Sequence, residues 1–165
     1  MQLLRFAAAR FAAAQIPESI ARALALARLT LQKPQGGVRG IATGDVFRRL
    51  VSKALARQFA GAFTEATFPF QFALQTRSGT DALAGLLRVT TELDPEATVV
   101  SLDGVGAYDH VSRAAFLDRL REVAPELVPF VRLWYGGMST YYWSDDAGER
   151  HTIPQGEGCE QGDAL

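Results

Sequence analysis

The stretch that decides the fold is Val99–Asp109, VVSLDGVGAYD, in which a short apolar run ends in a carboxylate. Residues 98–102 are mostly β-branched or apolar, which predicts a strand buried on both faces. Asp103 follows the carboxyl end of this strand, and Gly104 leaves the backbone beside it open. A carboxylate next to a bare carbonyl offers the oxygen ligands that Mg²⁺ prefers. The stretch therefore predicts a metal-binding strand end, with an Asp that caps the following turn as the alternative.

A second polar segment, Gly156–Leu165 (GEGCEQGDAL), lies about fifty residues further along the chain. Gly162 would let a ligand approach the backbone closely, because glycine has no side chain. Gln161 places an amide group beside it. An earlier Gln-Gly pair falls within Ile153–Gly156, and a plain loop is the alternative for either pair.

Taken in this order, the two segments resemble palm motifs A and B of reverse transcriptases, most closely those of non-LTR retroelements. The resemblance implies that Asp103 holds catalytic metal. It also implies that Tyr108 lies under the nucleotide sugar and excludes a 2′-hydroxyl, with an ordinary core aromatic as the alternative. Gln161 and Gly162 would contact the pair formed by the template base and the incoming nucleotide. Asp109 matches a common family residue, and we assign it a structural role because it lies six residues past Asp103.

The second segment departs from the family's motif B at one position, where Ala164 replaces a proline. The family's third palm motif, an aromatic-x-Asp-Asp turn, would follow after Leu165. We therefore expect the chain to be a reverse transcriptase domain truncated after motif B and inactive by itself. A palm sheet without the third motif would have an unpaired strand edge, which favours self-association.

A glycine-rich turn near the start of the chain carries Lys33 and Arg39 on either side of Gly36 and Gly37. Two glycines can supply the positive φ angles of a tight hairpin. Two cations on such a hairpin can close on a polyphosphate. The pattern resembles the fingers hairpin of reverse transcriptases, where a lysine and an arginine clamp the triphosphate of the incoming nucleotide. A solvated basic turn is the alternative.

Contacts with nucleic acid are predicted at two further places. Arg48, Arg49 and Lys53 fall on a helix predicted over residues 46–62. Arg49 and Lys53 share one face, because residues four apart are neighbours on a helix. Contact with the template backbone and a solvated face fit this pattern equally well. Gln71 begins a block that resembles the one preceding motif A in retroelements, which implies support of the template strand.

The net charge of −1 conceals an asymmetry. Residues 1–60 carry ten Lys or Arg and two acids, whereas the remaining residues carry seven basic and sixteen acidic side chains. A basic half joined to an acidic half suits a protein that grips phosphates with one part and holds divalent metal with the other. Two solvated faces of opposite sign are the alternative.

The composition of the chain excludes several classes of protein. Cys159 is the single cysteine, which excludes an internal disulfide and a cysteine-rich metal site and indicates an intracellular protein, nuclear or cytoplasmic. His110 and His151 show no metal-ligand spacing, so we expect both to be structural. The apolar runs are too short for a membrane span. Residues 1–31 are rich in Ala, Leu and Arg, which is also typical of a mitochondrial transit peptide.

The predicted fold class is α+β, with partial polymerase fingers and palm and a small antiparallel sheet backed by helices. Residues 1–31 are expected to form a helical N-terminal extension, and residues 32–165 a partial reverse transcriptase domain. Periodicity and capping residues predict helices over residues 2–14, 18–31, 46–62, 78–91, 112–123 and 125–135, and a hairpin over 139–153.

The resemblance implies RNA-templated DNA synthesis in the complete parent, by two-metal nucleotidyl transfer with Mg²⁺. The implied partners are an RNA template, a DNA primer and deoxynucleoside triphosphates, and no membrane. A non-catalytic nucleic-acid-binding module and an inert retroelement remnant are the alternatives. Steep salt dependence of binding without metal dependence would favour the binding module.

Overall fold

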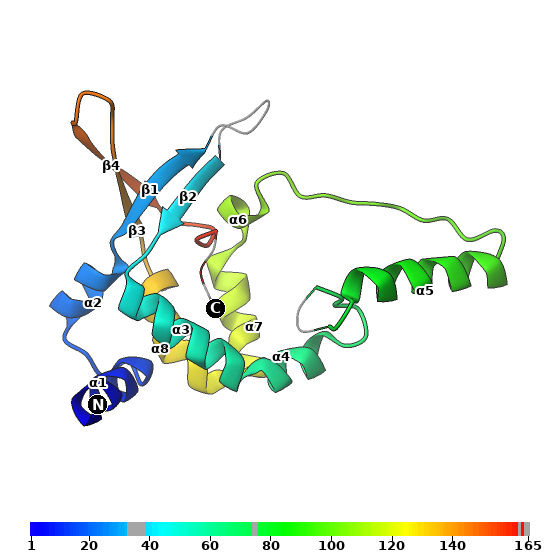
Figure 1. The fold of residues 1–165 in the computed structure, drawn as a ribbon, viewed down its shortest axis with the longest axis horizontal. Coiled ribbons are helices and arrows are strands. Elements are labelled where there is room, and N and C mark those ends of the chain that lie inside the picture. Colours follow the sequence, from blue (N-terminus) through cyan, green and yellow to red (C-terminus); the bar gives the residue numbers. More distant parts are fainter. Residues whose placement is uncertain (33–38, 74–75, 162, 164–165) are drawn as a thin grey trace. The chain divides into compact units, whose positions relative to one another are not determined.

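The computed structural model describes residues 1–32, 39–73, 76–161 and 163. It divides into two compact units, Met1–Gln58 with Gly106–Leu165, and Phe59–Val105, and each is described by itself (Figure 1). The described part of the chain contains helices and one mixed sheet, which agrees with the α+β class. No helix in these ranges is both long enough and apolar enough to cross a membrane.

The first unit contains one sheet of four strands in the order β2-β1-β3-β4. β1 (Ala27–Gln32) pairs antiparallel with β2 (Arg39–Thr43), and β3 (Ser139–Ser144) pairs antiparallel with β4 (Arg150–Gln155). β1 and β3 run parallel, with Ala27 opposite Tyr141. The predicted antiparallel sheet is therefore wrong in one respect: two antiparallel hairpins are joined through a parallel pair of their first strands.

The helix predicted over residues 18–31 is shorter than expected. α2 covers Glu18–Ala25, and the chain then enters β1. Residues 28–32 pair in register with residues 39–43, so tertiary pairing overrides the helical composition of this stretch. The hairpin predicted around the glycine-rich turn is confirmed by this pairing, while the turn itself lies outside the described residues.

The other helices of the first unit follow the capping signals. The Oδ1 atom of Asp45 accepts hydrogen bonds from the amides of Phe47 at 2.8 Å and Arg48 at 3.1 Å, as expected for a helix N-cap. Ser112 caps α7 through the amide of Ala115 at 3.3 Å. The helices are α1 (Gln2–Ala12), α3 (Val46–Gln58), α6 (Ala107–His110), α7 (Arg113–Val123), a 3₁₀ turn η1 (Pro125–Leu127) and α8 (Val128–Tyr135).

Aromatic side chains form the core where α1, α3 and α8 meet. The Phe11 ring lies 5.4 Å from that of Phe47, 5.3 Å from that of Phe130 and 5.5 Å from that of Trp134, measured between centroids. Phe11 and Phe130 are fully buried. Burial of such rings contributes both area and edge-to-face contacts, so this cluster holds α1, α3 and α8 together.

The second unit contains α4 (Ala60–Thr67) and α5 (Gly79–Leu93), followed by the turn at residues 94–96. The helix predicted over 46–62 is thus divided near Phe59. Residues 97–104 form neither helix nor strand, and Val100 and Leu102 are 71% and 90% exposed. The strand predicted over residues 98–102, buried on both faces, is wrong: no described strand pairs with it, and a short apolar run cannot hold a strand without a partner.

Candidate functional site

Two segments that lie about fifty residues apart in sequence meet in the first unit. The backbone amide of Cys159 donates to the carbonyl of Tyr108 at 2.7 Å, and the amide of Gly158 donates to the carbonyl of Val111 at 2.9 Å. Tyr108 belongs to the short helix α6, which Gly106 begins with a φ of +62°. The structure therefore places the loop of residues 156–161 directly against residues 108–111.

Gly158 is the point of closest approach. Its φ is +78°, and a Cβ atom there would lie 2.5 Å from the carbonyl oxygens of Tyr108 and Asp109. Such a separation is far inside van der Waals contact, so the approach requires glycine. Sequence reasoning missed this residue and singled out Gly162, which lies outside the described residues.

Arg113 holds the loop from the side of α7. Its guanidinium donates to the carbonyls of Gly158 at 2.8 Å and Gly137 at 2.5 Å, and to the Ser139 hydroxyl at 2.9 Å. Its own backbone amide donates to Glu157 at 2.9 Å. The side chain is buried, so this one cation joins the loop to α7 and to the start of β3.

Arg48 holds the end of the loop from the side of α3. It donates to Glu160 at 2.9 Å and to Asp163 at 2.7 Å, and its guanidinium carbon lies 4.6 Å from the centre of the Trp134 ring. The side chain is 1% exposed. We expected Arg48 to contact nucleic acid, but the structure turns it inward on α3 and commits it to two carboxylates, so it presents no charge to a phosphate. Arg49 and Lys53 are exposed on the same helix.

Burial governs the titration of this network. Burial raises the pKa of the Glu160 carboxyl above its ordinary value, although Arg48 opposes the shift. Burial and the neighbouring Asp163 raise the pKa of Tyr135, whose hydroxyl donates to Asp163 at 2.6 Å. Burial also raises the pKa of the Cys159 thiol, which keeps it protonated and unsuited to act as a nucleophile.

A cavity of about 150 Å³ lies between the loop and the β1–β2 hairpin. A volume of this size holds a single small ring or a few waters. Gln161, one of the predicted site residues, reaches it together with polar side chains of the same loop. The lining residues are Leu29, Gly40, Ala42, Asp109, Tyr141, Ile153, Gln155, Cys159, Glu160 and Gln161.

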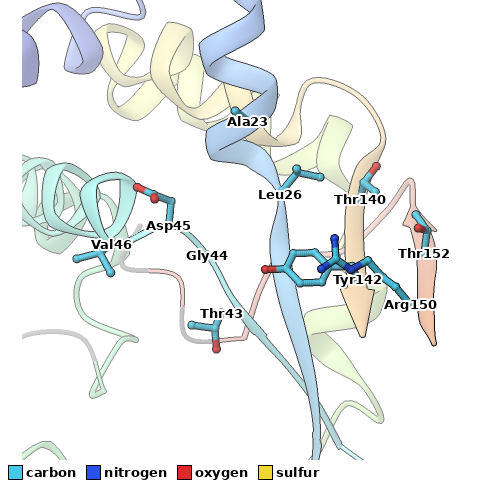
Figure 2. A pocket seen from close by; sticks show the side chains of 10 residues that line it. All are labelled: Ala23, Leu26, Thr43, Gly44, Asp45, Val46, Thr140, Tyr142, Arg150 and Thr152. Carbon is cyan, nitrogen blue, oxygen red and sulfur yellow. The ribbon is translucent and has the colours of Figure 1, made fainter. Parts of the chain in front are cut away.

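A larger hollow of about 600 Å³ opens between α2, the start of α3 and the β3–β4 hairpin (Figure 2). On one side Arg150 lies over the Tyr142 ring, with its guanidinium carbon 5.2 Å from the ring centre. Asp45 and Thr43 lie on the other side in Figure 2. Hydroxyl groups and one cation could bind a polar ligand here. The lining residues are Ala23, Leu26, Thr43, Gly44, Asp45, Val46, Thr140, Tyr142, Arg150 and Thr152.

The remaining predicted site residues that the structure describes line neither of these two cavities. Tyr108 is 53% exposed beside the loop. Asp103 and Gly104 are exposed in the second unit, within the segment that has neither helix nor strand. Gln71 is also in the second unit, and its Oε1 atom accepts from the amide of Ala73 at 2.7 Å.

Lys33 and Arg39 are the two cations predicted on either side of the glycine-rich turn. The backbone of Arg39 pairs with Gln32 at the start of β2, while Lys33 lies outside the described residues. Of the predicted site residues, Tyr108 and Gln161 belong to segments that the structure brings into contact, because the loop that contains Gln161 is hydrogen-bonded to the Tyr108 carbonyl.

The turn between β3 and β4 brings three possible metal ligands together around His151, for which we expected a structural role. His151 has two acidic neighbours, Asp145 and Glu149, with one donor atom from each of the three residues within 4.8 Å of the others. The sequence signal was present as Asp-x-x-x-Glu-x-His across a predicted hairpin.

Comparison of the chain with protein-family models, with curated proteins and with solved structures finds no match in any of the three.

Proposed function

We propose that this chain carries the fingers hairpin and the first part of the palm of a reverse transcriptase domain, most similar to those of non-LTR retroelements. The reaction is RNA-templated extension of a DNA primer by deoxynucleoside triphosphates. The observation that carries the proposal is the pair of backbone hydrogen bonds from the loop of residues 156–161 to Tyr108 and Val111. These bonds join the two segments that resemble motifs A and B.

In the proposed site, Tyr108 selects the sugar. Its ring is half exposed, and its backbone is fixed because its carbonyl accepts the Cys159 amide. A ring under the sugar would exclude a 2′-hydroxyl by contact, without needing its own hydroxyl. Gln161 lines the adjoining cavity and offers an amide to the nascent base pair.

The proposed metal is Mg²⁺, which would align the triphosphate and activate the primer hydroxyl. The Asp103 carboxylate and the Gly104 carbonyl are oxygen donors and exposed, so their chemistry fits a hard cation that keeps waters. One carboxylate is a weak site by itself, so the substrate phosphates would supply further ligands. Lys33 and Arg39 would bind the same triphosphate from the fingers hairpin.

The test is equilibrium binding of dATP and ATP in the presence of Mg²⁺ and a template–primer in which the RNA template has an unpaired uracil next to the DNA primer end. We expect dATP to bind more tightly than ATP, and Tyr108→Ala to reduce this preference at least about tenfold by admitting the 2′-hydroxyl. The matched control is Tyr108→Phe, which keeps the ring and should keep the preference. Absence of Mg²⁺-dependent dATP binding would refute the proposal.

A second candidate function is nucleic-acid binding without catalysis. Arg49, Lys53 and Arg57 are exposed and four residues apart on α3, which forms a basic stripe suited to phosphates. Binding that weakens steeply with salt, is lowered by replacing all three with Gln, and is unaffected by Mg²⁺ or dATP would favour it.

A further inference from the structure

We propose that the turn between β3 and β4 is a binding site for a divalent zinc ion, with Asp145, Glu149 and His151 as protein ligands and water completing the coordination. The proposal concerns the hairpin alone and does not depend on the proposed polymerase function. It rests on a donor set that combines an imidazole with two carboxylates. Zinc accepts these ligand types, usually with tetrahedral geometry.

The three donors already converge. One donor atom from each residue lies within 4.8 Å of the other two, and the Nε2 atom of His151 is 2.8 Å from the Oδ2 atom of Asp145. Two ligands of a tetrahedral zinc ion lie about 3.3 Å apart, given metal–ligand bonds of about 2.0–2.1 Å. The His151–Asp145 pair therefore needs to open by about half an ångström, which side-chain rotation can supply.

The turn holds one carboxylate oxygen in place and leaves the other for a ligand. The Oδ1 atom of Asp145 accepts the amides of Ala147 at 3.0 Å and Glu149 at 2.9 Å. Gly148 gives the turn its shape with a φ of +81°. Because Oδ1 is engaged by the backbone, Oδ2 is aimed at His151 before any ion arrives, which reduces the ordering cost of binding.

The ring of His151 is also positioned. It stacks on Trp143, with centroids 4.7 Å apart and planes 25° from parallel. An ion would take the Nε2 lone pair, so the proton of the neutral ring would reside on Nδ1 and the hydrogen bond to Asp145 would be replaced by coordination. Glu149 is exposed, so its carboxylate is free of the core and can rotate toward the ion.

The first experiment is isothermal titration of untagged, chelator-treated protein with ZnCl₂ near neutral pH. One equivalent should bind. Co²⁺, used as a probe of coordination, should give visible d–d absorption of a low-coordinate site with nitrogen and oxygen ligands, which Zn²⁺ abolishes by competition. Cu²⁺ should quench the fluorescence of Trp143, because the ring stacks on a ligand.

Variants separate this site from others in the chain. His151→Gln, Asp145→Asn and Glu149→Gln should each weaken Zn²⁺ binding at least about tenfold, since each removes one ligand. Matched controls are His110→Gln, Asp146→Asn and Cys159→Ser, which retain the three ligands and should stay within about twofold. Trp143→Phe should abolish the Cu²⁺ quenching while leaving the Zn²⁺ affinity unchanged.

Asp145→Asn could disturb the turn, so the proposal is judged on His151→Gln and Glu149→Gln. Their circular dichroism should match that of the parent. The proposal is overturned if no equivalent of Zn²⁺ binds, or if both of these variants bind Zn²⁺ as the parent does. Either result would mean that His151 and Asp145 form a hydrogen bond that closes the hairpin turn and nothing more.

Discussion

The loop of residues 156–161 and the segment of residues 97–104 carry the two sequence patterns that suggested a polymerase, but their surroundings differ. The loop is bound by two buried arginines, Arg48 and Arg113, and by backbone hydrogen bonds to residues 108–111. The segment that contains Asp103 is exposed and has neither helix nor strand. A motif is therefore fixed in place by cations and backbone partners that lie far away in the sequence, and the motif's own residues do not specify these partners.

The largest effect is expected at Arg48. Arg48→Ala would leave Glu160 and Asp163 as buried carboxylates without their cation, because both pair with this side chain. Loss of one partner of a buried ion pair typically costs about 3–5 kcal/mol in unfolding free energy. Urea denaturation of the parent and of Arg48→Ala measures this difference in unfolding free energy. Arg49→Ala, one residue away and exposed, should change the value by less than about 0.5 kcal/mol, and equal effects would mean that the ion pairs contribute little.

The second effect concerns Arg113. Arg113→Ala removes three side-chain hydrogen bonds, to Gly158, Gly137 and Ser139, and of these acceptors Gly158 and Ser139 are buried. We expect the unfolding free energy to fall by about 2–4 kcal/mol. This is less than the sum for three hydrogen bonds from a charged group, because the effects are not additive. Hydrogen exchange should show faster exchange at the amides of Gly158 and Cys159. Arg119→Ala on the exposed face of α7 is the control, and unchanged exchange in Arg113→Ala would contradict the account.

Gly158 and Gly148 provide a matched pair. Both have positive φ, +78° and +81°, but a Cβ atom would clash with two carbonyl oxygens at Gly158 and meets nothing within 4 Å at Gly148. Gly148→Ala should cost about 1–2 kcal/mol, from backbone conformation alone. Gly158→Ala should cost about 1 kcal/mol more, because the loop must also move away from residues 108–111. Equal losses in thermal denaturation would show that the close approach is not maintained.

The pH dependence of stability should report on Glu160. Burial raises the pKa of its carboxyl in the folded protein, so the folded state keeps the proton to a higher pH than the unfolded chain does. Stability from this group is therefore present below the unfolded pKa and is lost as the pH rises through the folded pKa. Relative to the parent, the denaturation midpoint of Glu160→Gln should increase as the pH rises above the ordinary pKa of a glutamate carboxyl, and parallel pH profiles of the two proteins would oppose this interpretation.

The smallest effect on stability is expected in the segment of residues 97–104. Leu102 is 90% exposed, so Leu102→Asp should change the unfolding free energy by less than about 0.5 kcal/mol. Leu117→Asp is the contrasting variant, because Leu117 is buried on α7 and an unpaired charge there should be strongly destabilising. A large loss in Leu102→Asp would mean that residues 98–102 form the buried strand that the sequence predicted.

Local signals in the sequence predicted the local structure well. Asp45 and Ser112 cap their helices as expected, and both hairpins form in register because turn residues separate runs of strand-forming residues. The parallel pairing of β1 with β3 could not be predicted, since it depends on how two distant hairpins meet. The strand over 98–102 was predicted from composition, which does not supply a pairing partner.

The candidate site was predictable in the same limited sense. The sequence singled out Tyr108 and Gln161, and the structure brings their segments together. It could not reveal that Arg48 points inward, because Arg48 and Arg49 differ only in the face of α3 that they occupy. The role of Arg113 was equally hidden, since two of its three acceptors are backbone carbonyls, at residues 137 and 158, and the third is the Ser139 hydroxyl.

The most direct test of the proposed function is photolabelling with 8-azido-dATP in the presence of Mg²⁺ and template–primer, followed by mass spectrometry of tryptic peptides. The account predicts that label appears on residues 89–113, which contain Tyr108, and on residues 151–165, which contain Gln161. Unlabelled dATP added before irradiation should reduce the labelling of both peptides more effectively than ATP does. Label confined to other peptides, or labelling that dATP does not reduce, would contradict the claim that these two segments form a deoxynucleotide site.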